Sequence, residues 1–225
     1  MMKVTYLGHA SFKIECERNV VFIDPWLTGP TSPMKVDDVE RADIVLVTHD
    51  HGDHGYAEAV EICKKTGAYF VAINELGIQA KTEGVENVHT LNIGGSVEIG
   101  DISVTMVHAF HSCGKGAPTG FVAKFPCGTV YHPGDTGVFS DMQLFGELYG
   151  VDLFLVPCGD YYTQGIDQAV TSVKLVKPKA VIPMHYNTFP VIQIDPEEFK
   201  RRVAEEMKEV SVKITKPGEY EEFKF

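Results

Sequence analysis

The segment Thr48–His54 constrains what this chain can fold into more than any other part of the sequence. It places three histidines and two aspartates within seven residues, directly after the apolar run Ile44–Val47. Imidazole nitrogens and carboxylate oxygens are the ligands that zinc and other first-row divalent metals bind in proteins. The fold must therefore hold this segment at the end of a buried strand, where its side chains can converge on a metal.

The spacing inside this segment suits two metal ions. His49 and His51 stand two residues apart, so both side chains can point the same way in an extended chain. Gly52 permits a sharp turn that brings Asp53 and His54 towards a second point. The alternatives are a solvated His-rich loop or a single structural ion, although structural zinc is usually closed by four ligands that often include cysteine. One short loop is therefore predicted to supply ligands to two metals.

Three more candidate ligands stand just past the ends of other apolar runs. They are His111 after the run 102–107, Asp135 after 129–131 and His185 after 181–184. Open α/β sheets place their sites beyond the carboxyl ends of strands. We therefore expect these three side chains to meet the Thr48–His54 segment at one edge of the fold.

The order of the predicted elements indicates the fold class. Strands are predicted at 4–6, 12–14, 20–23, 44–47, 69–73, 97–99, 102–107, 121–125, 129–132, 153–156, 180–184 and 211–214, and helices at 57–66, 167–176 and 196–207. An early meander followed by strand and helix alternation in both halves is typical of two mixed β-sheets with outer helices. We predict an α/β fold, a four-layer αββα sandwich, formed by residues 1–225 as a single domain.

The ordered set of candidate ligands resembles that of the metallo-β-lactamase superfamily. The matching residues are His49-x-His51-x-Asp53-His54, then His111, Asp135 and His185. Finer segments resemble the ascorbate-phosphate-lactonase-like branch of its metal-dependent hydrolases: Leu-Gly-His-Ala-Ser-Phe at 7–12, Ile-Asp-Pro-Trp at 23–26, Gly-Asp-Thr-Gly at 134–137 and His-Tyr-Asn-Thr at 185–188. The resemblance extends over nearly the whole chain and implies a metallo-β-lactamase-like sandwich.

The resemblance also implies how two divalent metal ions share the ligands. Three histidines hold one ion, an aspartate and two histidines hold the other, and a further aspartate bridges them: His49, His51 and His111; Asp53, His54 and His185; and Asp135. Zinc is the first expectation for the metal. Manganese, nickel and iron are the alternatives, because the family includes members that use them.

Such a centre predicts hydrolysis. A water molecule between two ions is deprotonated near neutral pH, and the resulting hydroxide can attack a phosphodiester, a lactone or another ester. Asp53 and Asp135 are the expected catalytic ligands, and His9 is the candidate to protonate the leaving group or bind a substrate oxygen, with a purely supporting role as its alternative. Two other functional classes stay open: a di-iron oxidoreductase on the same scaffold and a non-catalytic metal-binding module.

Other polar residues near the strand ends are predicted to support the centre. Metal-bound histidines need their second ring nitrogen held by an acceptor, so Asp24 and Asp50 are expected to orient them, with a structural cap as the alternative for Asp50. Supporting roles are expected for His108 and His132. Substrate contacts are predicted for candidates at the rim of the site: Lys115 in the loop 112–119, Tyr161 and Asn187, with Tyr162 and Thr188 as similar candidates.

Charge and cysteine content limit the partners. A net charge of −11 disfavours nucleic acid and anionic membranes, whose binding depends on Lys and Arg, so a small molecule or short phosphodiester is the expected substrate. Homo-oligomerisation stays open. No apolar run approaches the roughly 20 residues that span a bilayer and no signal peptide is recognised, so a cytoplasmic location is expected. The five cysteines are scattered without a CxxC pair, so reduced thiols are expected.

Overall fold

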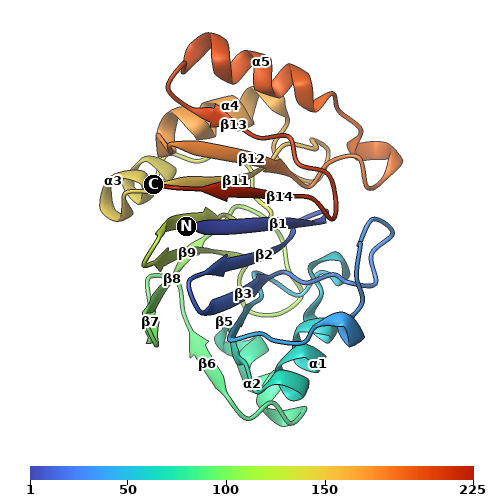
Figure 1. Cartoon of the computed structure of the whole chain (residues 1–225). Coiled ribbons are helices and arrows are strands. Elements are labelled where there is room, and N and C mark those ends of the chain that lie inside the picture. Colours follow the sequence, from blue (N-terminus) through green and yellow to red (C-terminus); the bar gives the residue numbers. More distant parts are fainter.

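Two seven-stranded β-sheets pack against each other, and helices cover their outer faces (Figure 1). This arrangement is that of a computed structural model, which describes residues 1–225. The predicted four-layer αββα sandwich of two mixed sheets is confirmed. The two ends of the chain lie close together, because the last strand pairs with the first.

The first sheet has an antiparallel half and a parallel half. Its strands are, in spatial order, β14 (Tyr220–Phe223), β1 (Met2–Gly8), β2 (Ser11–Cys16), β3 (Asn19–Ile23), β4 (Ile44–Leu46), β5 (Tyr69–Ile73) and β6 (Val88–Leu91). Pairing is antiparallel from β14 to β3 and parallel from β3 to β6. Parallel neighbours need long crossovers. Here α1 (Tyr56–Thr66) and α2 (Asn74–Thr82) form the crossovers into β5 and β6 and cover the sheet.

The second sheet also has an antiparallel half and a parallel half. Its strands are, in spatial order, β13 (Ser211–Val212), β12 (Ala180–Met184), β11 (Leu153–Pro157), β10 (Gly128–His132), β9 (Thr119–Phe125), β8 (Ile102–His108) and β7 (Ser96–Ile99). Pairing is antiparallel from β7 to β10 and parallel from β10 to β13. The crossovers are α3 (Met142–Tyr149), α4 (Ile166–Val176) and α5 (Pro196–Glu206).

The apolar core runs through both sheets. Phe12 and Phe70 of the first sheet share one buried cluster with Phe121 and Ile182 of the second. Another buried cluster, which includes Phe199 of α5, joins the second sheet to its helices. Each sheet is therefore a middle layer with apolar contacts on both faces, which fixes the positions of its strand ends.

The structure contains two α-helices and two strands beyond those predicted: α2, α3, β6 and β14. The strands β6 and β14 lie at the two edges of the first sheet and keep partly exposed side chains, so neither shows a clear apolar run. Thr5 of β1 pairs with Tyr220 of β14, a contact between opposite ends of the chain that no local pattern signals. The predicted closing strand at 211–214 is shorter than expected, because β13 ends at Val212.

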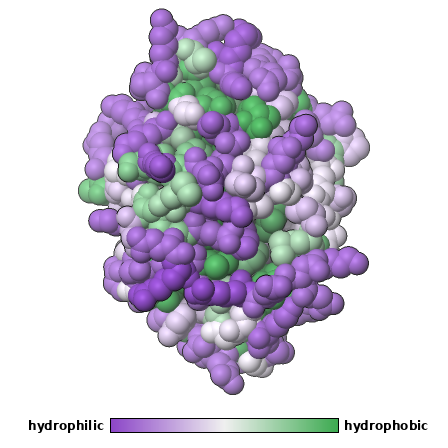
Figure 2. All heavy atoms as spheres, viewed as in Figure 1, coloured by the Kyte–Doolittle hydropathy of each residue, from purple (hydrophilic) through white to green (hydrophobic).

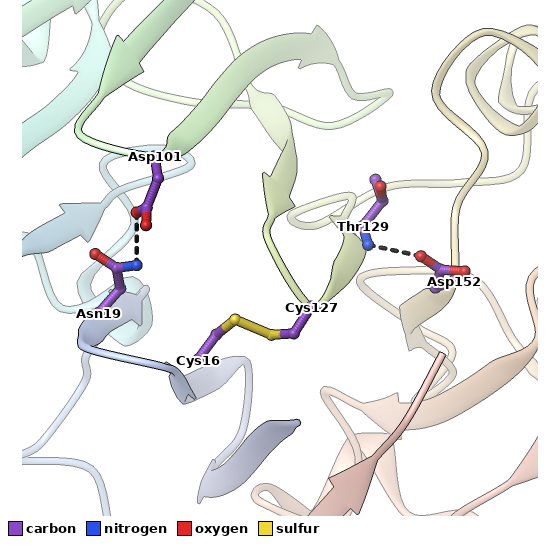
Figure 3. Close-up of a disulfide and its surroundings, with 6 residues drawn as sticks. All are labelled: Cys16, Asn19, Asp101, Cys127, Thr129 and Asp152. Atoms are coloured by element: carbon purple, nitrogen blue, oxygen red, sulfur yellow. Dashed lines mark hydrogen bonds between the residues drawn. A yellow bond between two sulfur atoms is a disulfide. The ribbon is translucent and has the colours of Figure 1, made fainter.

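Cys16 and Cys127 form a disulfide between the two sheets (Figure 3). The expectation of five reduced thiols is therefore wrong. Cys16 ends β2 and Cys127 lies in the turn between β9 and β10, so 111 positions separate them in sequence and only sheet packing brings them together. Beside them, the side-chain amide of Asn19 donates a hydrogen bond of 2.7 Å to Asp101, which also links the sheets. Both links lie at the end of the sandwich where β1 and β10 begin.

The three free thiols differ in accessibility, which predicts their reactivity. Cys63 and Cys158 are buried, whereas Cys113 is partly exposed. Burial raises the pKa of Cys63 to about 12 and also raises the pKa of Cys158. We expect iodoacetamide to alkylate Cys113 in the native protein and to spare the other two, because the reaction needs an accessible thiolate. Peptide mass spectrometry measures this, and labelling of Cys63 ahead of Cys113 would contradict the prediction.

Polar and charged side chains cover most of the face shown in Figure 2, and apolar side chains appear in patches between them. The longest helices, α1, α4 and α5, have 11 residues each. None of the helices combines the length and the hydropathy of a membrane span.

Candidate metal centre

Six segments with candidate ligands or their partners meet at one edge of the sandwich. They follow β1, β3, β4, β8, β10 and β12. Within each sheet these strands run in the same direction, because they are parallel to one another or separated by a single antiparallel strand. Their carboxyl ends lie together, and side chains beyond them from both sheets come into contact. This is the placement expected for a site in an α/β fold.

Four side chains form a first ligand group. The ligand atoms of His49, His51, His111 and Asp135 all lie within 4.8 Å of one another. Nε2 of His49 is 3.0 Å from Nδ1 of His51, and Nε2 of His111 is 3.5 Å from Oδ2 of Asp135. The loops after β4, β8 and β10 thus supply one set of donors suitable for one metal ion.

A second ligand group lies beside the first. It consists of His9, Asp53, His54 and His185, again with ligand atoms within 4.8 Å of one another. Asp135 of the first group also faces this one, since its Oδ2 lies 3.3 Å from Nε2 of His54 and 3.0 Å from Nε2 of His185. Asp135 therefore stands where the predicted bridging role requires it. The sequence predicts His9 as a proton donor and not as a ligand, and its ring lies beside the three ligands predicted for the second ion.

Several buried polar atoms of these groups make no hydrogen bond of acceptable geometry. They are Nε2 of His54, both ring nitrogens of His185 and Oδ1 of Asp135. An unpaired polar atom in a protein interior costs roughly 1–3 kcal/mol, and native proteins contain few of them. Imidazole and carboxylate lone pairs that converge in this way are the donor set of zinc and related divalent ions. The residues therefore fit two bound metal ions.

Burial and neighbouring charges set the protonation states of the ligands. Burial, followed by the charge of His54, lowers the pKa of His49 to about 2, so this imidazole is neutral. Burial alone would raise the pKa of Asp135, but the charges of His185 and His54 hold it well below its ordinary value. Burial alone would lower the pKa of His54, but the charges of Asp135 and Asp24 raise it well above its ordinary value. His54 therefore has to lose a proton when it coordinates a metal, because neutral imidazole and ionised carboxylate are the coordinating forms.

Asp24 fixes the orientation of His54. Its Oδ2 accepts a hydrogen bond of 2.7 Å from Nδ1 of His54. The backbone N–H and the hydroxyl of Thr48 donate to the same carboxylate at 2.8 and 2.6 Å. The proton of His54 is thereby held on Nδ1, and Nε2 is turned towards Asp135. The geometry is the one that the predicted orienting role of Asp24 needs.

Replacing Asp24 with asparagine is expected to weaken metal binding about 10- to 100-fold, because an amide oxygen is a weaker acceptor for the Nδ1 proton of His54 and an amide accepts fewer hydrogen bonds than a carboxylate. A competition titration against a chromogenic chelator measures the affinity. Asp141→Asn is the matched control, because Asp141 also faces a histidine, His108 at 3.6 Å, but outside both ligand groups. Equal metal affinity in Asp24→Asn and the unchanged protein would show that the contact is dispensable.

Asp50 and Lys115 have partners other than those predicted. Oδ1 of Asp50 accepts a hydrogen bond of 2.7 Å from the backbone N–H of Gly114, and no ligand histidine is bonded to this carboxylate. Asp50 therefore ties the loop after β4 to the loop that follows His111, which is a structural role and not the predicted orienting one. The ammonium group of Lys115 donates to Oε1 of Gln79 on α2, so it is held at an outer helix and away from the predicted substrate contact.

His132 connects two loops of the site. Its buried ring donates from Nε2 to the carbonyl of Ala10 at 2.8 Å, and its Nδ1 accepts from the backbone N–H of Gly134 at 3.1 Å. These two contacts require the neutral ring with its proton on Nε2, in agreement with a pKa that burial lowers. The ring joins the turn that carries His9 to the loop that carries Asp135, as a supporting residue does.

His9 lies between the second ligand group and the loop after β12. Its Nε2 is 3.1 Å from Oδ2 of Asp53, and its Nδ1 is 3.0 Å from Oγ1 of Thr188. Burial lowers the pKa of His9 to about 4, although its hydrogen bond with Asp53 opposes the shift. The ring is therefore neutral near pH 7 and can donate a single hydrogen bond.

The remaining predicted residues lie outside both ligand groups. The side-chain oxygen of Asn187 accepts a hydrogen bond of 2.8 Å from the backbone N–H of Ile194, which closes its own loop. Tyr161 and Tyr162 pack against each other and are exposed. His108 packs against phenylalanine rings. Substrate contact by Tyr161 and Asn187 stays a prediction.

The backbone of the site has unusual φ angles and a close approach between two segments, and residue types alone do not reveal either feature. His9, Asp24 and His185 have φ angles of 54°, 45° and 55°. Residues other than glycine adopt this left-handed region at a cost, and such strain is typical of functional sites. Gly55 ends the ligand loop after β4, and a Cβ there would lie 2.3 Å from the backbone of Pro25. The loop can approach the segment after β3 only because position 55 is glycine.

Two mixed seven-stranded sheets with outer helices, and a centre of histidines and aspartates at one edge, define the metallo-β-lactamase class of fold. Residues 3–185 match the family model described as the beta-lactamase superfamily domain, and the chain belongs to this family. The narrower resemblance to the ascorbate-phosphate-lactonase-like branch stays a prediction.

Two relatives are similar to this chain over nearly their full length. A metal-dependent hydrolase of Methanopyrus kandleri is 47% identical over 227 residues, which cover 97% of this chain and 98% of that protein. Igni18, a novel metallo hydrolase from the hyperthermophilic archaeon Ignicoccus hospitalis, has a TM-score of 0.93 at 39% identity, with 100% of this chain and 99% of that one covered. CmlA, a diiron beta-hydroxylase from Streptomyces venezuelae, has a TM-score of 0.77 with 100% and 54% covered; its 16% identity shows the fold alone.

Proposed function

We propose that this protein is a metal-dependent hydrolase that uses two divalent metal ions. One observation carries the proposal: Oδ2 of Asp135 lies 3.0 to 4.0 Å from Nε2 of four histidines, two from each ligand group. The full-length similarity to proteins named metal-dependent hydrolase and metallo hydrolase supports it.

Each ligand group would hold one of the two proposed ions. His49, His51 and His111 would hold one ion, Asp53, His54 and His185 would hold the other, and Asp135 faces both sets of ligands. When bound, two such ions supply an activated water and polarise the bond that is cleaved. Zinc is the first candidate because imidazole-rich sets suit it, and manganese, nickel and iron are the alternatives.

Neighbouring side chains hold the reacting groups in place. Asp24 orients His54, and His132 anchors the turn that carries His9. The ionised carboxylate of Asp53 can only accept a hydrogen bond, so the proton of the neutral His9 ring lies on Nε2, beside the second ligand group, and Nδ1 accepts from the hydroxyl of Thr188. From there His9 can donate a hydrogen bond to a substrate oxygen, which is the role we propose for it.

The proposed substrate is a small phosphodiester, a lactone or another ester. Two divalent ions carry more positive charge than the carboxylates of Asp53 and Asp135 balance, so the centre attracts a negative or strongly polarised oxygen. Phosphoryl groups and ester carbonyls both present such an oxygen. The net charge of −11 on the chain favours a small substrate over a long nucleic acid.

Elemental analysis combined with turnover assays tests the proposal. The purified protein is assayed with bis(4-nitrophenyl) phosphate and with a panel of small lactones, and protein stripped by a chelator is the control. Two metals per chain with metal-dependent cleavage of one class would support the proposal and select the substrate class. Metal-loaded protein that cleaves neither class would favour a binding module, and redox turnover of an iron-loaded protein would favour the di-iron alternative.

A further inference from the structure

A pocket of about 330 Å³ lies beside His9, at the edge of the sandwich that carries the ligand groups. Most of its lining comes from three separate parts of the chain: β1 and the turn after it, the loop after β12 with Tyr186 and Thr188, and the segment between β13 and β14 with Thr215. Small-molecule sites usually have volumes of about 300–1,000 Å³. The pocket is therefore large enough for a compact organic group.

The lining of this pocket is mainly apolar and contains no acidic residue. Ile214, Pro217 and Tyr186 contribute apolar surface, and Lys216 is the one Lys or Arg among the lining residues. Acidic residues outnumber basic ones in the chain as a whole, which has a net charge of −11. A pocket free of carboxylates in such a chain disfavours a cationic ligand and suits a neutral or anionic organic group.

Thr215 gives the pocket a hydrogen-bonding group without a partner. Its side chain is buried, with 2% exposed, and no atom of the protein pairs with its Oγ1. Buried hydroxyls are normally paired, because an unpaired one has lost water without replacement. The hydroxyl is shielded from solvent, and a rotation about the Cα–Cβ bond would turn it into the pocket, where a polar atom of a bound molecule would supply the missing partner.

Two hydrogen-bonded side chains connect this pocket to the ligand groups. His9 and Thr188 both line the pocket, and Oγ1 of Thr188 lies 3.0 Å from Nδ1 of His9. On its other side the same ring lies 3.1 Å from Oδ2 of Asp53. One imidazole ring therefore separates the pocket from the second ligand group. A molecule that fills the pocket with one part has its remaining part next to His9.

We propose that this pocket binds the organic part of the substrate that is not cleaved: a compact, mainly apolar group with one polar atom that pairs with Thr215. The proposal rests on the hydrolase function proposed above. The pocket selects the substrate, and the ligand groups act on its ester or phosphoester bond.

Trp26 supplies a binding signal, because it is the single tryptophan of the chain and its ring centroid lies 5.4 Å from that of His9. Titration of the purified, metal-loaded protein with benzyl alcohol, which has one ring and one hydroxyl, should change the fluorescence of Trp26 and saturate in the millimolar range. Thr215→Val should weaken binding about 2- to 10-fold, the effect of one neutral hydrogen bond. Ile214→Phe, which fills the pocket, should weaken it by about tenfold or more.

Thr163→Val is the matched control for Thr215→Val. It also removes a buried, unpaired hydroxyl, but Thr163 does not line the pocket. This variant should bind benzyl alcohol as the unchanged protein does. Binding that Ile214→Phe does not weaken would place benzyl alcohol elsewhere and overturn the proposal, as would equal effects of the two threonine substitutions.

Turnover separates this proposal from the hydrolase proposal. Bis(4-nitrophenyl) phosphate is compared with methyl 4-nitrophenyl phosphate, or 4-nitrophenyl phenylacetate with 4-nitrophenyl acetate, according to the bond that the protein cleaves. Ile214→Phe should raise the ratio of the KM of the aromatic member to that of the methyl member about tenfold. Turnover with an unchanged ratio and no benzyl alcohol binding would overturn the pocket alone. Saturable binding that depends on Thr215, without any hydrolysis, would overturn the hydrolase function alone.

Discussion

Asparagine in place of Asp135 is expected to lower turnover about 10²- to 10³-fold and to reduce the metal content below two ions per chain. The carboxylate is buried, and its Oδ2 faces Nε2 of His54 and His185 at 3.3 and 3.0 Å and Nε2 of His111 at 3.5 Å. An amide of the same shape has no charge to balance two cations and presents one oxygen in place of two. The centre should therefore lose both its shared ligand and its negative charge.

The measurement combines elemental analysis with the rate of metal-dependent hydrolysis on the same preparation, and a thermal melt shows that the variant is folded. Asp101→Asn is the control, because it also removes one carboxylate but lies beside the disulfide at the opposite end of the sandwich (Figure 3). Two ions per chain and full turnover in Asp135→Asn would show that the bridging assignment is wrong.

Loss of the disulfide between Cys16 and Cys127 is expected to lower the free energy of unfolding by about 2–5 kcal/mol. The bridge closes a separation of 111 positions, and the loop-entropy model gives about 4.7 kcal/mol for a loop of roughly 100 residues. In a chain of this size 1 kcal/mol corresponds to about 2–4 °C in Tm. The double variant Cys16→Ser/Cys127→Ser should therefore melt about 5–20 °C below the unchanged protein.

Thermal melts with and without a reductant measure this effect. The reductant should lower the Tm of the unchanged protein and leave that of the double variant where it is. Cys113→Ser is the matched control, because it removes a free thiol and no bridge. Metal content should be the same in all three proteins, because the disulfide lies at the end of the sandwich remote from the ligand groups. A Tm that the reductant does not change would refute the stabilising role.

The candidate ligands could be predicted because their signals are local. Four of them fall in one loop directly after an apolar strand, and the other three each follow a strand that residue type and length reveal. The structure brings all seven into the two ligand groups. Strand direction explains this convergence, since the preceding strands run the same way in each sheet and end at one edge.

The hydrogen-bond partners of individual polar side chains could not be predicted from the local sequence. Asp50 stands in the middle of the ligand loop, yet it bonds to the backbone of Gly114. Nothing in the sequence around Thr48 indicated its two hydrogen bonds to Asp24. Lys115 lies four residues after His111 but bonds to an outer helix. Sequence proximity to a ligand therefore did not predict the hydrogen-bond partner, because each side chain turns to the partner that packing offers.

The sequence by itself determined which residues are candidate metal ligands and the order of the layers, because residue type, spacing and periodicity are local properties. Only the tertiary structure decided which distant segments touch. The pairing of Cys16 with Cys127, the closure of the first sheet by β14 and the pocket beside His9 all depend on how two sheets pack and where the chain returns. Such contacts form between segments far apart in the chain, so no local pattern encodes them.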